Sequence, residues 1–352
     1  MTRYQEVQRE LRKTPRAWLV TGAAGFIGSN LVEKLLELGQ EVVGIDNFAT
    51  GSRQNLEDVR AGVGDELWKS FHFIEGNICN LDTCHQACKG IDYVLHQAAL
   101  GSVPRSINDP ISTNRTNVDG FLNMLVAARD MKIRRFVYAA SSSTYGDEQS
   151  LPKVEGRIGQ PLSPYAVSKY ANELYAHVFQ RHYGLEAIGL RYFNVFGRRQ
   201  DPEGAYAAVI PRWVGRMLAG DSCTIYGDGE TSRDFTHIDN VLQANLLAVV
   251  TSSGSTDQIY NVACGERITL ESLFSLIRDG LARREPEIAN QQPAYGDFRA
   301  GDVRHSLASI EKISDRLGYR VERSVKEGLE LSLDWYIEHA CRDSRPGRSD
   351  LR

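Results

Sequence analysis

The sequence has few of the features that mark metal-binding, disulfide-rich or membrane proteins. Its 352 residues include six cysteines and eight histidines, and neither set has the spacing of zinc ligands. Cys79, Cys84 and Cys88 lie close together but form no Cys-x-x-Cys pair, so we expect free thiols and no metal. No apolar run approaches the roughly 20 residues of a membrane helix. Residues 1–16 are polar and lack the apolar core of a signal peptide, so we expect a cytoplasmic protein.

Neither positive nor negative charge is in large excess. The formal net charge is −4, which provides no long-range attraction to nucleic acid or to an anionic membrane. Apolar residues make up 42% of the chain, enough for ordinary cores, and 352 residues exceed one minimal domain. We therefore expect two lobes that share a cleft. The sequence contains no internal repeat and no low-complexity linker.

A strand, a glycine turn and a helix follow one another near the start of the chain. The apolar residues 17–21 lead into Gly22, Gly25 and Gly28, and residues 29–38 have apolar side chains at helical spacing. Such a turn lets a pyrophosphate approach the backbone at a helix N-terminus. The next strand, residues 41–45, ends in Asp46, where a carboxylate would bind the adenosine ribose and repel a 2′-phosphate. The pattern predicts NAD rather than NADP, although Arg53 lies close in sequence.

Tyr165 and Lys169 are one helical turn apart, and Ser163-Pro164 before them is typical of a helix start. An ammonium about 4 Å away would supply roughly the 4 kcal/mol that brings a phenol pKa from about 10 to near 7. Ser141 follows the apolar run 136–140 and could share the proton of a substrate alcohol. We therefore predict that Ser141, Tyr165 and Lys169 perform acid–base chemistry on a carbon-bound hydroxyl, beside a hydride transfer.

With this glycine spacing and Tyr-x-x-x-Lys pair, the chain resembles the extended branch of the short-chain dehydrogenase/reductase family, over roughly residues 16 to 340. The resemblance implies an α/β fold: a doubly wound, Rossmann-type parallel sheet and a smaller mixed α/β substrate-binding lobe. It assigns residues 16–195 and 236–263 to the NAD-binding domain, and 196–235 and 264–341 to the sugar-nucleotide domain. Residues 1–15 would form an N-terminal extension, and 342–352 a flexible tail.

The resemblance also supplies the cofactor residues. Asn77 replaces the aspartate that relatives usually carry there, and its carbonyl keeps an acceptor for the adenine. Asn117 is expected to open a helix that, with the helix after Ser163, would pair two copies into a homodimer. The expected NAD-binding residues are Gly22, Gly25, Phe26, Ile27, Gly28, Asp46, Asn47, Thr50, Gly51, Asn77, Ile78, Gln97, Ala98, Ala99, Thr116, Tyr165, Lys169 and Val195.

Within this branch, the residues after the strand-end serine separate the chemistries. Dehydratases carry Thr-Asp-Glu there and uronic acid decarboxylases carry Ser-Glu, whereas this chain has Ser142, Ser143 and Thr144. It therefore resembles nucleotide-sugar 4-epimerases, and most closely those that act on UDP-N-acetylglucosamine and UDP-N-acetylgalactosamine, with UDP-glucose and UDP-galactose as lesser substrates. A UDP-uronic acid 4-epimerase, with Arg198, Arg199 or Arg267 near the sugar carboxylate, and a non-catalytic NAD-sensing regulator remain alternatives.

The substrate residues follow from the same resemblance. Arg233 and Arg299 would bind the diphosphate, Asp302 the uridine ribose, and Tyr226 or Trp213 the uracil. A small Ser306 would leave room for the acetamido group, framed by Ser142, Ser143 and Gln200. The full expected set is Gly101, Ser102, Ser141, Ser142, Ser143, Tyr165, Asn194, Gln200, Val209, Trp213, Tyr226, Arg233, Arg299, Asp302 and Ser306.

Overall fold

The computed structural model describes residues 1–202, 207–256, 258–298 and 303–343. The strands are β1 (Ala17–Thr21), β2 (Glu41–Asp46), β3 (Phe71–Glu75), β4 (Tyr93–His96), β5 (Arg135–Ser141), β6 (Ala187–Tyr192), β7 (Val195–Phe196), β8 (Thr224–Tyr226), β9 (Ser232–Arg233), β10 (Thr236–His237), β11 (Gln258–Val262), β12 (Ile268–Thr269) and β13 (Ala294–Gly296). The helices are α1 (Arg3–Lys13), α2 (Phe26–Glu37), α3 (Arg53–Trp68), α4 (Leu81–Cys88), α5 (Val103–Asn108), α6 (Pro110–Asn114), α7 (Gly120–Asp130), α8 (Pro164–Tyr183), α9 (Val209–Leu218), α10 (Ile238–Val250), α11 (Leu270–Ala282), α12 (Glu311–Leu317) and α13 (Val325–Asp343).

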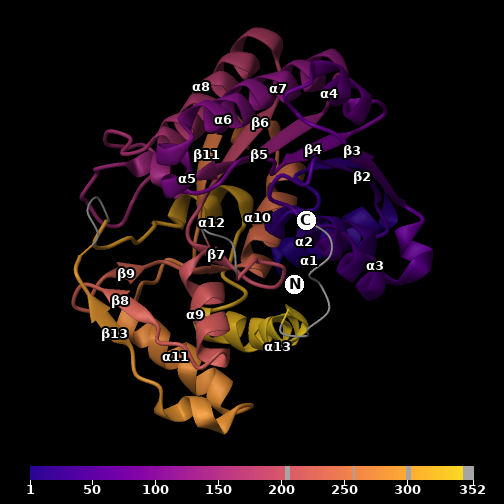
Figure 1. Cartoon of the computed structure of the whole chain (residues 1–352). Helices are drawn as coiled ribbons and strands as arrows, with labels where there is room; N and C mark the ends of the chain where they lie inside the picture. Colours follow the sequence, from indigo (N-terminus) through magenta and orange to yellow (C-terminus); the bar gives the residue numbers. More distant parts are fainter. Residues whose placement is uncertain (203–206, 257, 299–302, 344–352) are drawn as a thin grey trace.

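Seven parallel strands form the central sheet, in the order β11-β6-β5-β4-β1-β2-β3. The apolar side chains of β1, β4, β5 and β6 are buried on both faces, as expected of a parallel sheet, whereas those of the edge strand β3 are only partly buried. In Figure 1, α4, α7 and α8 cover one face, while α1, α2 and α10 lie on the other. The doubly wound fold expected from the sequence is confirmed.

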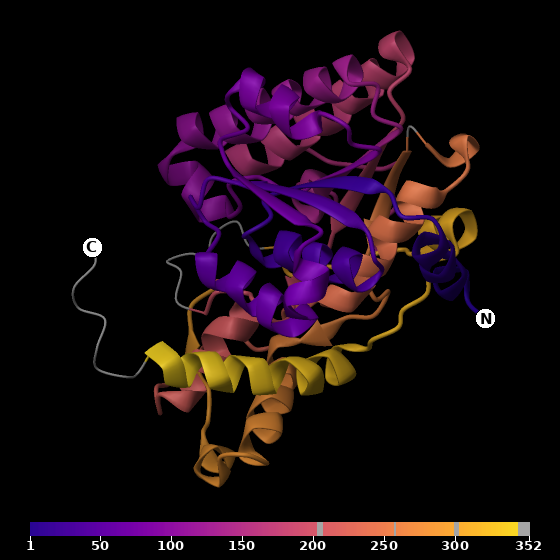
Figure 2. The same ribbon diagram turned by 90° about the vertical axis from the view of Figure 1, so that its right-hand side faces the viewer.

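Residues after β6 build a smaller lobe with its own core. Its two-stranded pairs β12-β9 and β13-β8 pack with α9, α11 and α13 around buried Trp213, Phe274 and Leu333. β11, α10 and α12 nevertheless return to the large core, so α12 interrupts the sugar-nucleotide domain expected over residues 264–341. Figure 2 shows α13 running beneath the cofactor-lobe helices and above α11.

The N-terminal helix α1 is part of the main core. Tyr4, Val7 and Leu11 are buried, and α1 packs on α10. Gln40 fastens its end, because Nε2 donates to the Leu11 carbonyl at 2.9 Å while Oε1 accepts from Trp18 Nε1 at 3.1 Å. Across the described part of the chain, no helix combines the length and apolarity needed to span a membrane.

Candidate active site

The glycine turn after β1 has the geometry that a bound dinucleotide requires. Gly22 has φ +69°, and a Cβ there would lie 2.9 Å from the Ala98 nitrogen. A Cβ on Gly28 would lie 1.9 Å from the Gly22 carbonyl oxygen, so only glycine lets α2 start this close to the turn. In the described chain no side chain caps α2, which leaves its first amides and the positive end of its dipole available to phosphate oxygens.

Asp46 is fixed at the end of β2. Oδ2 accepts from the Ala24 amide at 2.9 Å, and Oδ1 accepts from the Phe48 amide at 2.8 Å. Burial nevertheless raises the pKa of this carboxyl group. Arg53, the residue that could have favoured a 2′-phosphate, pairs with Glu75 at 2.7 Å and stacks 4.2 Å from the Phe48 ring centre. The site therefore fits the ribose hydroxyls of NAD.

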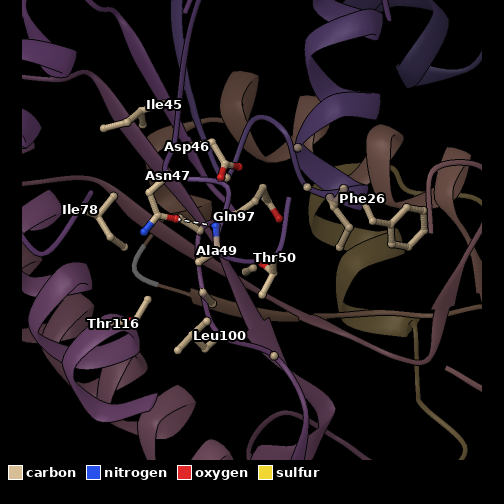
Figure 3. A pocket seen from close by; sticks show the side chains of 18 of the residues that line it. Phe26, Ile45, Asp46, Asn47, Ala49, Thr50, Ile78, Gln97, Leu100 and Thr116 are labelled. Carbon is tan, nitrogen blue, oxygen red and sulfur yellow. Dashed lines mark hydrogen bonds between the residues drawn. The ribbon is translucent and has the colours of Figure 1, made fainter. Parts of the chain in front are cut away.

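Between these elements lies a cavity of about 450 Å³. Figure 3 shows Ile78 and Thr116 on one side and Phe26 on the other, with Asn47 Oδ1 accepting from the Ala49 amide at 3.1 Å. Of the expected cofactor residues, the wall contains Gly22, Gly25, Phe26, Ile27, Gly28, Asp46, Asn47, Thr50, Asn77, Ile78, Gln97, Ala98, Ala99, Thr116, Tyr165, Lys169 and Val195. Gly51 is the exception: it packs against the Ala24 backbone, where a Cβ would lie 2.8 Å from the carbonyl carbon.

The same wall contains residues that our sequence reasoning missed: Ile45, Ala49, Gly76, Leu100, Ala139, Ala140 and Tyr192. Most occupy or follow the carboxyl ends of parallel strands, where ligands of such sheets bind, so strand position was an available signal. Tyr192 is directly opposite Ser141 in the β5–β6 register. Its hydroxyl contacts Gln97 Oε1 and Asn245 Oδ1, both at 3.3 Å, and burial raises its pKa to about 12.

Ser141, Tyr165 and Lys169 meet at this cavity. Ser163 caps α8 by accepting from the Ala166 amide at 3.1 Å, which fixes Tyr165 in the first turn. Ser141 lies at the end of β5 and is hydrogen-bonded to Tyr165. Lys169 is 3% exposed, and its Nζ donates to the Ala139 carbonyl at 2.9 Å.

The expected effect of Lys169 on Tyr165 is not found in this geometry. Burial raises the pKa of Tyr165, and the bond from Ser141 lowers it only in part. Burial also lowers the pKa of Lys169 to about 8. Nζ lies 6.0 Å from the Tyr165 ring centre and is turned toward a backbone carbonyl. Burial therefore favours the neutral phenol form of Tyr165 in this geometry.

The sequence predicted that Asn117 opens a helix, and this is wrong. Asn117 lies within a π-helical turn (Arg115–Asp119) that precedes α7. Its Oδ1 accepts from the Leu100 amide at 2.7 Å, and its Nδ2 donates to Ser168 Oγ at 3.1 Å. The side chain thus joins the loop after β4 to the helix that carries Tyr165. Single π-helical turns of this kind are frequent at functional sites of proteins.

A second cavity, of about 130 Å³, lies in the smaller lobe. Its wall contains the expected Asn194, Val209, Trp213, Tyr226 and Arg233, together with Arg212, Thr224, Phe235 and Leu270, which we did not anticipate. Trp213 is mainly a core residue, 2% exposed and packed edge-on to Phe274 at 5.9 Å. Tyr226 is 37% exposed and is the more accessible aromatic. Arg233 Nη1 donates to the carbonyls of Ser232 and Arg304 at 3.0 and 3.1 Å.

The other expected substrate residues lie at several places around these cavities. Gly101 and Gln200 are on the wall of the large cavity. Ser102 caps α5, and Ser143 Oγ donates to Ser141 Oγ at 2.9 Å, with Ser142 between the two serines. Ser306 donates its backbone amide to the Ser232 carbonyl at 3.0 Å. Arg299 and Asp302 lie outside the described residues.

Two arginines that we considered for a sugar carboxylate are engaged elsewhere. Arg199 Nη2 and Nη1 lie 3.0 and 3.1 Å from the two carboxylate oxygens of Glu33, and Arg198 also contacts Glu33. Glu33 and Arg199 are buried. A bidentate pair of this kind is not available to a substrate without leaving Glu33 uncompensated.

The cysteines at 79, 84 and 88 are free. Burial raises the pKa of Cys84 and of Cys88 to about 12. Both are therefore thiols at neutral pH, and Cys84 donates to the Ile78 carbonyl. His96 is likewise buried beside Thr21, 2.9 Å from its hydroxyl, and burial lowers its pKa to about 3.

Residues 18–263 match the family described as the NAD dependent epimerase/dehydratase family. A UDP-N-acetylglucosamine 4-epimerase of Methanobrevibacter ruminantium, solved with UDP-N-acetylmuramic acid, is 36% identical, with a TM-score of 0.84 over 92% of this chain and 99% of that one. A putative UDP-glucose 4-epimerase of Methanocaldococcus jannaschii is 35% identical over 90% of this chain and 97% of its own. The UDP-glucuronic acid 4-epimerase of Bacillus cereus, solved with UDP-glucuronic acid and NAD, is 30% identical, with a TM-score of 0.81 over 92% and 99%.

Proposed function

The chain belongs to the NAD-dependent epimerase/dehydratase family, with NAD as its cofactor, and we propose that it interconverts UDP-N-acetylglucosamine and UDP-N-acetylgalactosamine. Among UDP-sugar 4-epimerases, this assignment rests on the charge of the cavity wall. Of the described residues on that wall, only Asp46 and Lys169 carry a formal charge at neutral pH. Asp46 belongs to the ribose end, and Lys169 is bonded to the Ala139 carbonyl.

This charge pattern supports epimerisation over elimination. Removing water from a sugar needs an acid to protonate the leaving hydroxyl, and the described wall has no carboxylate beside Ser141. Ser141 and Tyr165 can only exchange a proton with a sugar hydroxyl. When NAD is bound, it supplies a hydride acceptor and donor for C4 and a positive ring that favours the Tyr165 phenolate.

The steps assigned to the protein are few. Tyr165 removes the O4 proton through Ser141, which bridges the phenol and the sugar, while Lys169 keeps positive charge nearby. After the keto sugar turns about its diphosphate and C4 regains the hydride on its other face, Tyr165 returns the proton to O4. The contacts to the hexose must be weak enough for this rotation, so neutral serine and glutamine side chains suit it.

The same neutrality supports an N-acetylated hexose over a uronic acid. A buried sugar carboxylate would need a cationic partner. Of the three arginines considered for that role, Arg198 and Arg199 are bound to Glu33, whereas Arg267 acts electrostatically on His305, next to Ser306. Ser306 has a small side chain at the position where resemblance to galactose-specific relatives suggests a tyrosine. Ser142, Ser143 and Gln200 offer hydroxyl and amide groups to an acetamido group.

A product assay tests the proposal. Purified protein is incubated with UDP-N-acetylglucosamine without added NAD, and the sugars are separated by chromatography and identified by proton NMR. We expect UDP-N-acetylgalactosamine to form, with UDP-glucose turned over at lower kcat/KM. Preferred turnover of UDP-N-acetylglucosaminuronic acid would contradict the substrate assignment.

We also propose a homodimer formed through α8. Val167, Leu174 and Val178 are exposed along α8, and Ile111 of neighbouring α6 is 80% exposed. Such a patch beside a groove between Pro110 and Val167 is typical of a protein–protein interface. α6 continues through the π-helical turn Arg115–Asp119 into α7, the helix expected from the sequence to pair with α8. Replacing Val167 with Asp should yield monomers in analytical ultracentrifugation; an unchanged sedimentation coefficient would contradict this interface.

A further inference from the structure

The segment from residue 193 to 200 connects the two cavities. Asn194 is on the wall of the smaller one, whereas Val195 and Gln200 are on the wall of the larger one. Its backbone is unusual, with φ +33° at Asn194, +150° at Gly197 and +67° at Arg199. Positive φ is disfavoured for residues that have a Cβ, so the surroundings must hold this conformation.

One support comes from α2. Glu33 is 4% exposed, and both of its carboxylate oxygens are used by Arg199, which is 5% exposed. Burial would raise the pKa of Glu33, but its bonds to Arg199 and Arg198 outweigh burial and lower it. Asn30, one turn earlier on α2, donates Nδ2 to the Arg198 carbonyl at 3.1 Å. The segment is thus fixed to the helix whose N-terminus lines the cofactor cavity.

A second support comes from α13. The Tyr336 hydroxyl donates to the Gly197 carbonyl at 2.9 Å and accepts from the Gly197 amide at 3.3 Å. Gln200 in turn donates Nε2 to the Val195 carbonyl at 3.0 Å. A Cβ on Gly197 would lie 2.6 Å from Ile238 Cγ2, so the backbone also packs tightly against α10. These contacts leave the segment little freedom once Arg199 is paired.

Stability alone is a poor explanation for the Glu33–Arg199 pair. Buried ion pairs contribute little net free energy, because desolvation offsets the attraction. Within the described structure, Arg199 Nε is buried without an acceptor, which a pair optimised for stability would avoid. What the pair does specify is the position of the backbone on either side of it.

We propose that Glu33 is a positioning residue: through Arg199 it holds segment 193–200 so that Asn194 and Gln200 keep their places on the walls of the two cavities, where the sugar nucleotide would bind. Because Glu33 is on α2, the helix that receives the pyrophosphate of NAD also determines the geometry of the sugar site. The kinetic part of this proposal rests on the proposed epimerase activity, and its structural part does not.

The test compares two isosteric variants, Glu33→Gln and Glu186→Gln. Glu186 pairs with Arg135 at 3.0 Å, also largely buried, but at the opposite end of β5 from Ser141. Both variants should lose stability. We expect only Glu33→Gln to raise KM for UDP-N-acetylglucosamine about tenfold with kcat within about threefold of wild type, and only Glu33→Gln to become open to trypsin after Arg198.

Trypsin cleavage does not depend on any substrate, so it separates this proposal from the function itself. If the wild type turns over no UDP-hexose, the proposed function fails while the cleavage comparison still decides the role of Glu33. If Glu33→Gln does not fold, Arg199→Lys takes its place: it keeps the charge but not the bidentate geometry, and we expect a KM increase of about threefold. Equal KM values and equal trypsin resistance in the Glu33→Gln and Glu186→Gln variants would overturn the proposal.

Discussion

The two cavities are lined by different kinds of groups. The large one is lined by the glycine turn, by strand ends and by buried side chains such as Lys169 and Asp46, each fixed by a backbone partner. The smaller one has the arginines Arg212 and Arg233 on its wall and a half-exposed Tyr226. The difference fits a cofactor that stays bound through each cycle and a sugar nucleotide that enters and leaves. Preformed backbone contacts suit the first, and charged, accessible side chains suit the second.

The largest expected effect comes from a substitution that removes the proton acceptor from the larger cavity but leaves NAD bound there. Tyr165→Phe removes the proton acceptor but no contact that holds the fold, so we expect kcat to fall by about 10³. NAD should remain bound, as measured by its release on acid denaturation. Lys169→Arg serves as a comparison that keeps the charge. Turnover within tenfold of wild type in Tyr165→Phe would rule out Tyr165 as the base.

The sequence predicts a region well when its contacts join residues that are close together along the chain. The turn at Gly22, Gly25 and Gly28 is local, and Asp46 follows at a regular spacing, so both were predictable. The Glu33–Arg199 pair joins residues 166 positions apart, and no local pattern indicates it. The raised pKa of Tyr165 depends on burial by several elements, which spacing on one helix does not reveal.

The buried carboxyl group of Asp234, in the segment between β9 and β10, should make the free energy of unfolding depend on pH. Asp234 Oδ1 accepts from the Cys264 amide at 2.9 Å and Oδ2 from the Gly265 amide at 3.0 Å, and burial raises its pKa to about 7. Between about pH 4 and pH 7 the native state keeps a proton that the unfolded chain has released, so the free energy of unfolding falls as pH rises. At about 1.4 kcal/mol per pKa unit, the fall is on the order of 4 kcal/mol.

In the Asp234→Asn variant, the free energy of unfolding, measured by urea denaturation, should differ less between pH 5 and pH 8 than it does in the wild type. The exposed carboxylate of Glu57 provides the matched control, because Glu57→Gln should keep the wild-type difference between the two pH values. An unchanged pH dependence in Asp234→Asn would show that the Asp234 carboxyl group does not titrate in this range.

A substitution at Ser306 tests whether the space around the sugar determines which sugar the protein accepts. Ser306→Tyr adds a large ring where we expect the acetamido group, so KM for UDP-N-acetylglucosamine should rise about 30-fold, a size typical of steric discrimination. KM for UDP-glucose should stay within about threefold. Ser306→Ala, which keeps the space, should leave both values near those of wild type. Equal losses for both sugars would place Ser306 away from the acetamido group.

The smallest expected effect concerns the nucleotide end of the smaller cavity. Tyr226→Ala removes an accessible aromatic ring from the wall, and stacking on a base contributes about 1–3 kcal/mol. We expect KM to rise about tenfold with kcat unchanged. Tyr295, on neighbouring β13 and 53% exposed, is the control, since Tyr295→Ala removes a surface ring that is not on the cavity wall. Equal effects of the two substitutions would contradict the stacking role.

The docking of α1 on α10 has a consequence for how the chain is made. Residues 3–13 leave the ribosome early, yet the surface that buries Val7 is synthesised roughly 225 residues further along. At about 5–20 residues per second, the helix waits about 10 to 45 s for its partner. Throughout that interval Tyr4, Val7 and Leu11 lack the α10 surface that covers them in the folded protein, and the strand β11 that completes the sheet is translated later still.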